Sequence, residues 1–226
     1  MKIVFLPGLD GSGMLTQADE LAGVTGLAVE LVKYPLDLTR YSDILDWLKP
    51  QLPAEEYVLV AEPFSGPIAA CIGAAGSPYL KGIVFIATFA RRPRRVPVRV
   101  AKILRVFPVR SAFAVWLGQP FLAGRWSSED FVRHLKGALG EVPKSTISAR
   151  LEEVLSVDAT EELTQIAVPM LYIRAREDRL IPRRSSDDFT EAGAELAEVE
   201  GPHFLAQTRP EIVAKEIARF LISLDA

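Results

Sequence analysis

Six short apolar runs, separated by helix-like segments, constrain the fold of this chain more than any other feature. The runs are rich in Val, Ile and Leu and lie at residues 3–6, 27–32, 57–61, 82–87, 169–173 and 195–199. Continuous apolar strands of this kind are typical of parallel sheets that are covered on both faces. Helical patterns lie between the runs, near residues 14–21, 41–51, 64–75, 158–166, 183–192 and 210–224. This alternation predicts an α/β protein with a mostly parallel, doubly wound sheet.

The alternation is interrupted once, over residues 91–156. This stretch has no convincing strand, and five prolines divide it into short helical pieces. An insertion this long between two core strands is expected to be a helical cap rather than a loop. We therefore expect one domain of 226 residues, with a core formed by residues 1–90 and 157–226 and a cap formed by residues 91–156.

Composition excludes several classes of partner and location. The net charge of −3 gives no overall field that would attract nucleic acid. Cys71 is the only cysteine, so no intrachain disulfide can form, and we expect a cytoplasmic protein. No apolar run approaches the roughly 20 residues that a transmembrane helix needs. The oligomeric state is left open by the sequence.

Pro63 stands where a nucleophile is expected. The apolar run at residues 57–61 turns abruptly into a helix through Ala-Glu-Pro-Phe-Ser, which is the layout of a nucleophile elbow. Ala61 and Ser65 fill the two positions that require small residues, so the nucleophile position falls on Pro63. Proline has no nucleophilic side chain. This one residue therefore decides whether the chain can carry out covalent catalysis.

Three further segments accompany this elbow in a particular chain order. A glycine-rich turn, Leu-Pro-Gly-Leu-Asp-Gly-Ser-Gly, follows the first apolar run at residues 6–13. Asp178 begins the sequence Asp-Arg-Leu-Ile-Pro after the fifth run, and His203 lies in Gly-Pro-His-Phe after the sixth. Nucleophile, acid and then histidine is the chain order of the triad in α/β-hydrolases.

With these four motifs, the chain resembles small bacterial α/β-hydrolase-fold serine esterases over essentially its whole length. The resemblance implies the α/β-hydrolase fold and ester hydrolysis through an acyl-enzyme, without a metal or a cofactor. It implies that Asp178 is the triad acid and His203 the base. The backbone N–H groups of Leu9 and Phe64 would form the oxyanion hole. The chain departs from the family at Pro63, where such proteins carry serine.

Several other residues are alternatives for the same roles. Glu177, Asp187 and Asp188 are alternatives to Asp178, but the last two lie in a predicted helix and are interpreted as a solvated face. Ser65 is the alternative nucleophile; we interpret it as a small residue that allows close helix–strand packing. His134 is interpreted as a solvated residue of the cap.

Further small and sulfur-containing residues have structural interpretations. Ser12 is interpreted as a turn residue, and Cys71 as a core residue of the helix that follows the elbow.

The backbone at Pro63 should differ from that of a working elbow. A nucleophile elbow holds its central residue at positive φ, with a strain on the order of 1–3 kcal/mol. Proline is fixed near a φ of about −65° and is favoured at the first position of a helix. We therefore expect a relaxed turn, in which the Phe64 N–H no longer points to the oxyanion position.

The substrate side of the site is expected from two segments. Gly8 and Asp10 in the glycine-rich turn would contact the substrate, because glycines let the backbone approach it closely. Trp116 and Phe121 lie in an apolar stretch of the cap that is predicted to form the inner wall above the cleft. Eight basic residues between positions 91 and 110 are interpreted as a solvated rim; contact with an anionic substrate or a membrane surface is the alternative.

Two functions from different classes remain. The chain is either an esterase-type protein for small to medium acyl esters, inactive or weakly active because of Pro63, or a non-catalytic protein that binds a hydrophobic ligand or a protein partner.

Overall fold

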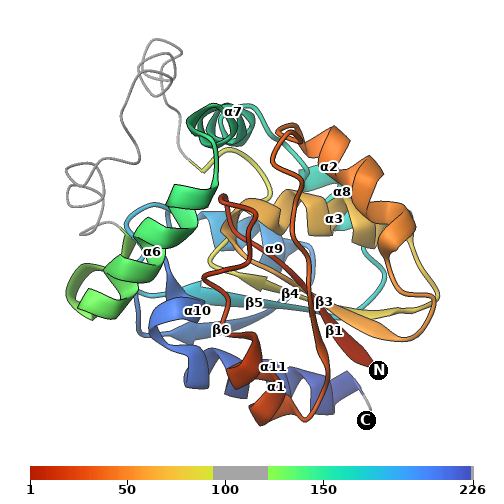
Figure 1. Ribbon diagram of the computed structural model, residues 1–226. Coiled ribbons are helices and arrows are strands. Elements are labelled where there is room, and N and C mark those ends of the chain that lie inside the picture. The colour runs from red at the N-terminus through yellow and green to blue at the C-terminus, as the bar shows by residue number, and fades with distance from the viewer. Residues whose placement is uncertain (94–121, 225–226) are drawn as a thin grey trace.

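The computed structural model describes residues 1–93 and 122–224, and its centre is a six-stranded sheet (Figure 1). The strands are β1 (Lys2–Leu6), β2 (Val29–Leu31), β3 (Tyr57–Ala61), β4 (Leu80–Ile86), β5 (Met170–Ala175) and β6 (Glu195–Val199). All neighbouring pairs are parallel, in the order β2-β1-β3-β4-β5-β6. The predicted parallel, doubly wound sheet is thus confirmed.

The ends of β3 and β6 match the predicted ends, whereas those of the other strands differ by one or two residues. The second strand is shorter than predicted because it lies at the edge of the sheet and pairs only with β1. β4 stops before Ala87, whose φ of 45° takes the backbone out of the strand conformation. This is the only positive φ among the described residues other than glycine, and it is a costly conformation for a residue with a Cβ atom.

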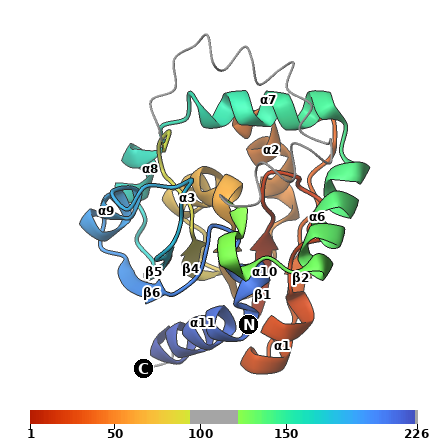
Figure 2. The ribbon, with the colours of Figure 1, turned by 90° about the vertical axis from the view of Figure 1, so that its left-hand side faces the viewer.

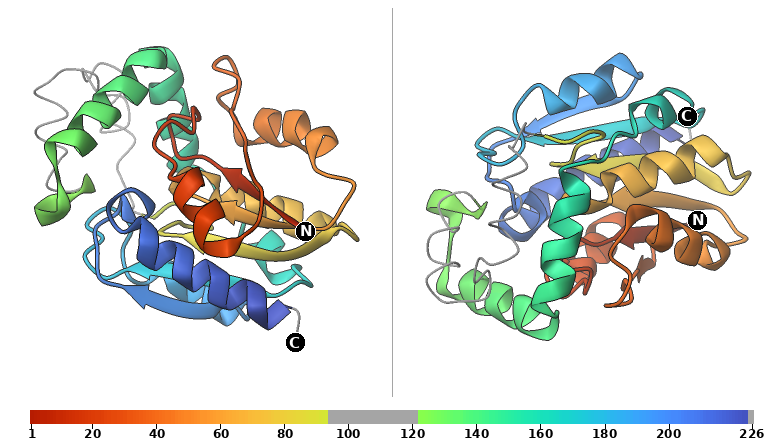
Figure 3. Two further views of the ribbon diagram at one scale, coloured as in Figure 1. Left: turned by 60° about the horizontal axis from the view of Figure 1, so that its bottom comes forward. Right: turned by 90° about the horizontal axis from the view of Figure 1, so that it is seen from above.

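Helices cover both faces of the sheet. On one face lie α2 (Tyr41–Leu48), α3 (Gly66–Ala75), α8 (Thr160–Thr164) and α9 (Ser185–Glu191). On the other lie α1 (Ala18–Thr25), α10 (Leu205–Thr208) and α11 (Pro210–Leu224), with α1 and α11 side by side (Figure 3, left). Each layer buries its own apolar cluster against the sheet, which explains why the strands are apolar on both faces.

The predicted last helix is found at Pro210–Leu224, whereas the first helix begins later than predicted. Gly13 has a φ of 69°, and the Thr16 N–H donates to the Gly13 carbonyl, so the chain makes a turn before α1 starts at Ala18. Gly26 ends this helix with a φ of 69°. Left-handed backbone of this kind is what glycine supplies at helix ends.

Within residues 91–156, the described residues from 122 onward are mainly helical, whereas Arg91 forms an isolated β-bridge with Asp158. The helical part contains η3 (Gly124–Trp126), α6 (Glu129–Glu141) and α7 (Lys144–Val154). Figure 2 shows α7 across the top of the core and α6 down one side of it. The Ser128 side chain accepts a hydrogen bond from the Phe131 N–H at 3.0 Å, which caps α6. Most of the basic stretch, with Trp116 and Phe121, lies outside the described residues.

Within the described residues, no helix is both long and apolar enough to cross a bilayer.

Candidate active site

The four sequence motifs meet at one edge of the sheet. The glycine-rich turn follows β1, the Pro63 turn follows β3, and the Asp178 and His203 loops follow β5 and β6. All of these strands are parallel, so the loops after their carboxyl ends gather on the same side. Ligands of open α/β sheets bind at this edge.

His203 and Asp178 form a hydrogen-bonded pair. The His203 Nδ1 atom lies 2.8 Å from Asp178 Oδ2, and both side chains are about nine-tenths buried or more. The other oxygen, Asp178 Oδ1, accepts the backbone N–H groups of Leu180 and Ile181, each at 2.8 Å. These bonds fix the carboxylate, which in turn fixes the imidazole ring. The His203 Nε2 atom is then the ring nitrogen that can act on a molecule in the adjacent cavity.

The alternatives to Asp178 have other partners. Glu177 pairs with Arg125 at 2.7 Å on the surface. Asp188 lies in a helix as expected, but its side chain is only 10 % exposed and receives a two-pronged bond from Arg91. The interpretation of Asp188 as part of a solvated face was therefore wrong, because Arg91, the first residue of the basic stretch, pairs with its carboxylate. Asp187 is exposed.

A cavity of about 370 Å³ lies beside this pair. His203, Pro63 and the turn residues Gly8, Leu9 and Asp10 are all in its wall. The wall is otherwise mainly apolar, and this apolar part includes Leu15, Phe89, Leu135, Leu139, Leu151 and Phe204. A cavity of this size and character accommodates a small apolar molecule. Leu135 and Leu139 come from α6 and Leu151 from α7, so the described helices of residues 91–156 supply part of the wall.

Pro63 occupies the first position of a short helix. It begins η2 (Pro63–Ser65), a 3-10 turn that leads into α3. Its φ is not positive, since only Ala87 and glycines have positive φ in the described chain. The Pro63 carbonyl accepts a hydrogen bond from Thr88 Oγ1 at 2.6 Å. The backbone is therefore the unstrained helical start that proline favours.

Gly66 is what allows that contact. A Cβ atom at Gly66 would lie 2.1 Å from Thr88 Oγ1 and 2.9 Å from the Phe89 carbonyl oxygen. Only glycine lets the loop after β4 approach the start of α3 so closely.

Ser65 is a structural residue. It is fully buried, and its hydroxyl donates to the Pro7 carbonyl oxygen at 2.5 Å. The Tyr34 hydroxyl, 2.6 Å from Ser65 Oγ, is then the donor of the second bond. Ser65 is not in the wall of the cavity, so its hydroxyl has no access to a ligand there.

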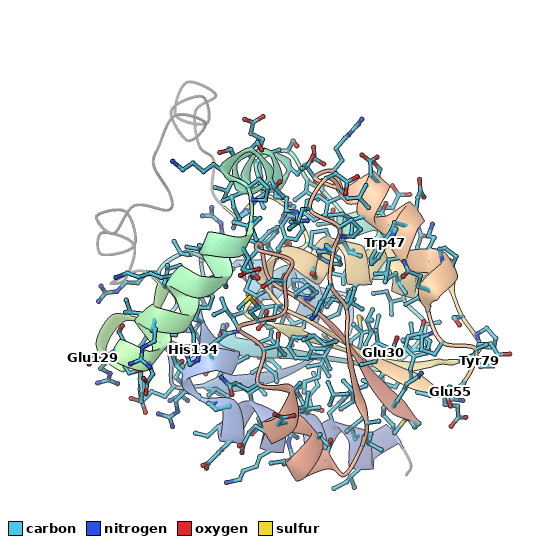
Figure 4. The ribbon with its side chains drawn as sticks, viewed as in Figure 1. Glu30, Trp47, Glu55, Tyr79, Glu129 and His134 are labelled. Atoms are coloured by element: carbon cyan, nitrogen blue, oxygen red, sulfur yellow. The ribbon has the colours of Figure 1, made fainter. Side chains whose placement is uncertain are left out.

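Three other residues considered above, Ser12, Cys71 and His134, are not in the wall of the cavity. Ser12 is a turn residue, since its backbone N–H donates to Asp10 Oδ2 at 2.9 Å. Cys71 is partly buried on α3. His134 is exposed on α6, where Figure 4 labels it.

Arg150 was missed by sequence reasoning. Its side chain is fully buried, although it lies on α7, and it holds the glycine-rich turn in place. The guanidinium donates to the carbonyl oxygens of four residues at 2.9–3.2 Å, namely Leu9, Asp10, Pro35 and Leu38. A Cβ atom at Gly11 would lie 2.3 Å from Arg150 Nη1, so the turn needs glycine there. No sequence pattern marks an arginine in a helical segment as buried.

Glu62 and Gln207 were also missed, although both are in the wall of the cavity. Gln207 Nε2 donates a short hydrogen bond to Glu62 Oε1. Burial, and secondly the charge of Asp10, raise the pKa of Glu62 to about 8. The sequence does contain a signal for Glu62, because a charged residue directly follows a fully apolar strand there.

The described residues contain no cluster of His, Cys, Asp and Glu side chains that could hold a metal ion.

Comparison with known proteins identifies the fold. No protein-family model and no curated protein sequence matches the chain. Among solved structures, an esterase from Exiguobacterium antarcticum superposes with a TM-score of 0.85 at 12% identity, covering 100% of this chain and 92% of its own. A bromoperoxidase from Bacillus anthracis superposes with a TM-score of 0.82 at 17% identity, covering 97% of this chain and 91% of its own. An enol-lactonase from Burkholderia xenovorans superposes with a TM-score of 0.79 at 15% identity, covering 97% of this chain and 90% of its own. The chain therefore has the α/β-hydrolase fold.

Proposed function

We propose that this chain is an esterase-type α/β-hydrolase that lacks its nucleophile, and that it binds small to medium acyl esters without turning them over efficiently. The observation that carries the proposal is the Asp178–His203 pair, held at 2.8 Å beside an apolar cavity whose wall includes Pro63. The esterase and enol-lactonase among its structural neighbours are consistent with an acyl substrate.

The roles of the residues follow from their positions. The ester would lie in the cavity beneath α6 and α7, which act as the cap, with its carbonyl group above Pro63. His203 is the general base, oriented by Asp178. The Leu9 N–H, in a turn fixed by Arg150, is the oxyanion donor on one side, and the Phe64 N–H is the expected donor on the other.

Pro63 removes the covalent step. With no hydroxyl group at this position, attack on the ester falls to a water molecule activated by His203. Enzymes that lose one triad member retain only about 10³–10⁴-fold catalysis over water. Because Pro63 starts a helix rather than a strained elbow, we expect the Phe64 N–H to be poorly aligned with the oxyanion, so activity should be lower still.

The second candidate is a binding protein without catalytic activity. The apolar cavity of about 370 Å³ favours it, because this space for a ligand is present although the nucleophile is not.

A panel of p-nitrophenyl esters of increasing chain length tests the proposal. Pro63→Ser should raise the rate by several orders of magnitude over the parent. Pro63→Ala is the matched control, since it frees the backbone without adding a nucleophile, and it should stay near the parent rate. Adding His203→Ala to Pro63→Ser should abolish the gain. A Pro63→Ser variant that is inert on every ester, while the parent still binds them, would favour the binding protein.

A further inference from the structure

Four polar residues interrupt the apolar wall of the cavity, and Glu62 is the one whose role is not yet assigned. Glu62 follows β3 directly, is 4 % exposed and lies in the wall beside Gln207 of α10. A buried carboxyl group in an apolar environment is costly when it is charged and unpaired, so its partners decide its state.

Among the described residues, both partners of this carboxyl group are donors. Gln207 Nε2 donates to Oε1, and the Gly8 backbone N–H is the second donor. In the described part of the chain, no hydrogen bond or ion pair joins a cation to this carboxyl group. A second carboxylate is close: a Cβ atom at Gly8 would lie 3.4 Å from Glu62 Oε2 and 3.6 Å from Asp10 Oδ1. Burial and the negative charge of Asp10 raise the pKa of Glu62 to about 8, so at neutral pH the group is mainly a neutral acid.

The proton of this neutral acid needs an acceptor. A protonated carboxyl group has one O–H donor, while the bonds from Gln207 and Gly8 occupy acceptor positions. Asp10 Oδ1 is the acceptor that the chain itself offers, and a ligand in the cavity, whose wall includes Glu62, can supply another. Neutral carboxylic acids kept protonated by an apolar site act in this way as hydrogen-bond donors in other enzymes.

We propose that Glu62 binds the ligand directly, by donating a hydrogen bond from its protonated carboxyl group to the carbonyl oxygen of a neutral ester. This inference rests on the proposed ester-binding function and names the residue that selects for the ligand. It makes the ligand class a neutral carbonyl compound with an apolar body, because the rest of the wall offers mainly apolar contacts.

Other charged or titratable groups lie around Glu62, and their effects on binding must be distinguished from those of Glu62. Asp10 faces it from the turn after β1, and His203 shares the cavity wall from the loop after β6. Tyr34, from the loop after β2, interacts with it electrostatically, and Arg150 of α7 binds the Asp10 backbone. These groups are the same in the parent and in Glu62→Gln, so any pH dependence that they cause persists in the variant.

The test is calorimetric titration of ethyl hexanoate into the parent and Glu62→Gln, at pH 6.5 and pH 9. Only the protonated form of Glu62 should bind well, so the parent should bind about tenfold more weakly at pH 9. Glu62→Gln keeps a neutral donor and a neutral acceptor but cannot titrate. It should not show this tenfold loss, and any smaller pH dependence caused by the neighbouring groups should be the same in the variant and the parent.

A second readout does not depend on ligand affinity. At pH 6.5 the parent should have an infrared C=O band of a protonated carboxylic acid that is absent from Glu62→Gln, and this band should shift when ethyl hexanoate is added. Equal affinity of the parent at both pH values, an equal loss of affinity in Glu62→Gln, or absence of the band would overturn the role of Glu62 alone. Failure of the parent to bind the ester at either pH would overturn the proposed ester pocket as well.

Discussion

Replacing Arg150 by methionine should destabilise the protein strongly, although this residue lies on a helix outside the core sheet. The side chain makes five hydrogen bonds to the carbonyl oxygens of Leu9, Asp10, Pro35 and Leu38. Bonds to a charged group contribute about 1.5–3 kcal/mol each, so five sum to roughly 10 kcal/mol. In the variant the free-energy cost of burying the guanidinium charge is absent, and this offsets several kcal/mol of the loss. We expect a net loss of about 3 kcal/mol.

Differential scanning calorimetry measures this loss. For a chain of this size, 1 kcal/mol corresponds to about 2–4 °C, so Arg150→Met should unfold about 6–12 °C below the parent. Arg133→Met is the matched control, because Arg133 lies on α6 with 72% of its side chain exposed and pairs only with Asp130 among the described residues. It should change stability by less than about 0.5 kcal/mol. An Arg150→Met protein within about 1 kcal/mol of the parent would refute the role assigned to this network.

Two further predictions concern the turn after β3. Pro63→Ser should unfold a few degrees below the parent, because restoring a strained elbow costs about 1–3 kcal/mol; a more stable serine variant would mean that Pro63 is itself the strained residue. Glu62 has a pKa of about 8 in the folded protein, against about 4.3 for an ordinary glutamate. The folded state therefore binds a proton that the unfolded state has released between these values, and stability falls as the pH rises through that window. In urea titrations the parent should lose up to about 4 kcal/mol relative to Glu62→Gln between pH 5 and pH 8; parallel pH profiles would contradict the raised pKa.

The sheet could be predicted from the sequence because its central strands are buried on both faces. Those strands are mostly apolar runs that alternate with helical patterns, whereas the edge strands β2 and β6 carry exposed glutamates. The ends of β3 and β6 were also predicted, but the ends of the other strands were not, because they depend on neighbouring segments and on the local backbone. Ala87 leaves the strand conformation with a positive φ, which no residue pattern indicates for alanine.

The site was predictable where its residues lie directly after strands. Asp178 and His203 each follow a strand within a short motif, and the structure brings them into contact. Arg150 and Gln207 could not be found in this way, because neither directly follows a strand and each has a residue type that is normally exposed, whereas Glu62 directly follows β3 and was overlooked. Their burial depends on carbonyl groups and amides from distant parts of the chain. The cytoplasmic location, inferred from a single cysteine, stays a prediction.

The central claim is that residue 63 is the empty nucleophile position of an otherwise assembled triad. The most direct measurement is covalent labelling with a fluorophosphonate probe, followed by peptide mass spectrometry. The parent should remain unlabelled, and Pro63→Ser should take up one probe on the introduced serine. His203→Ala in the same background should lose the label, whereas Ser65→Ala should keep it. A label on Ser65 in the parent, or no label in Pro63→Ser, would contradict the account.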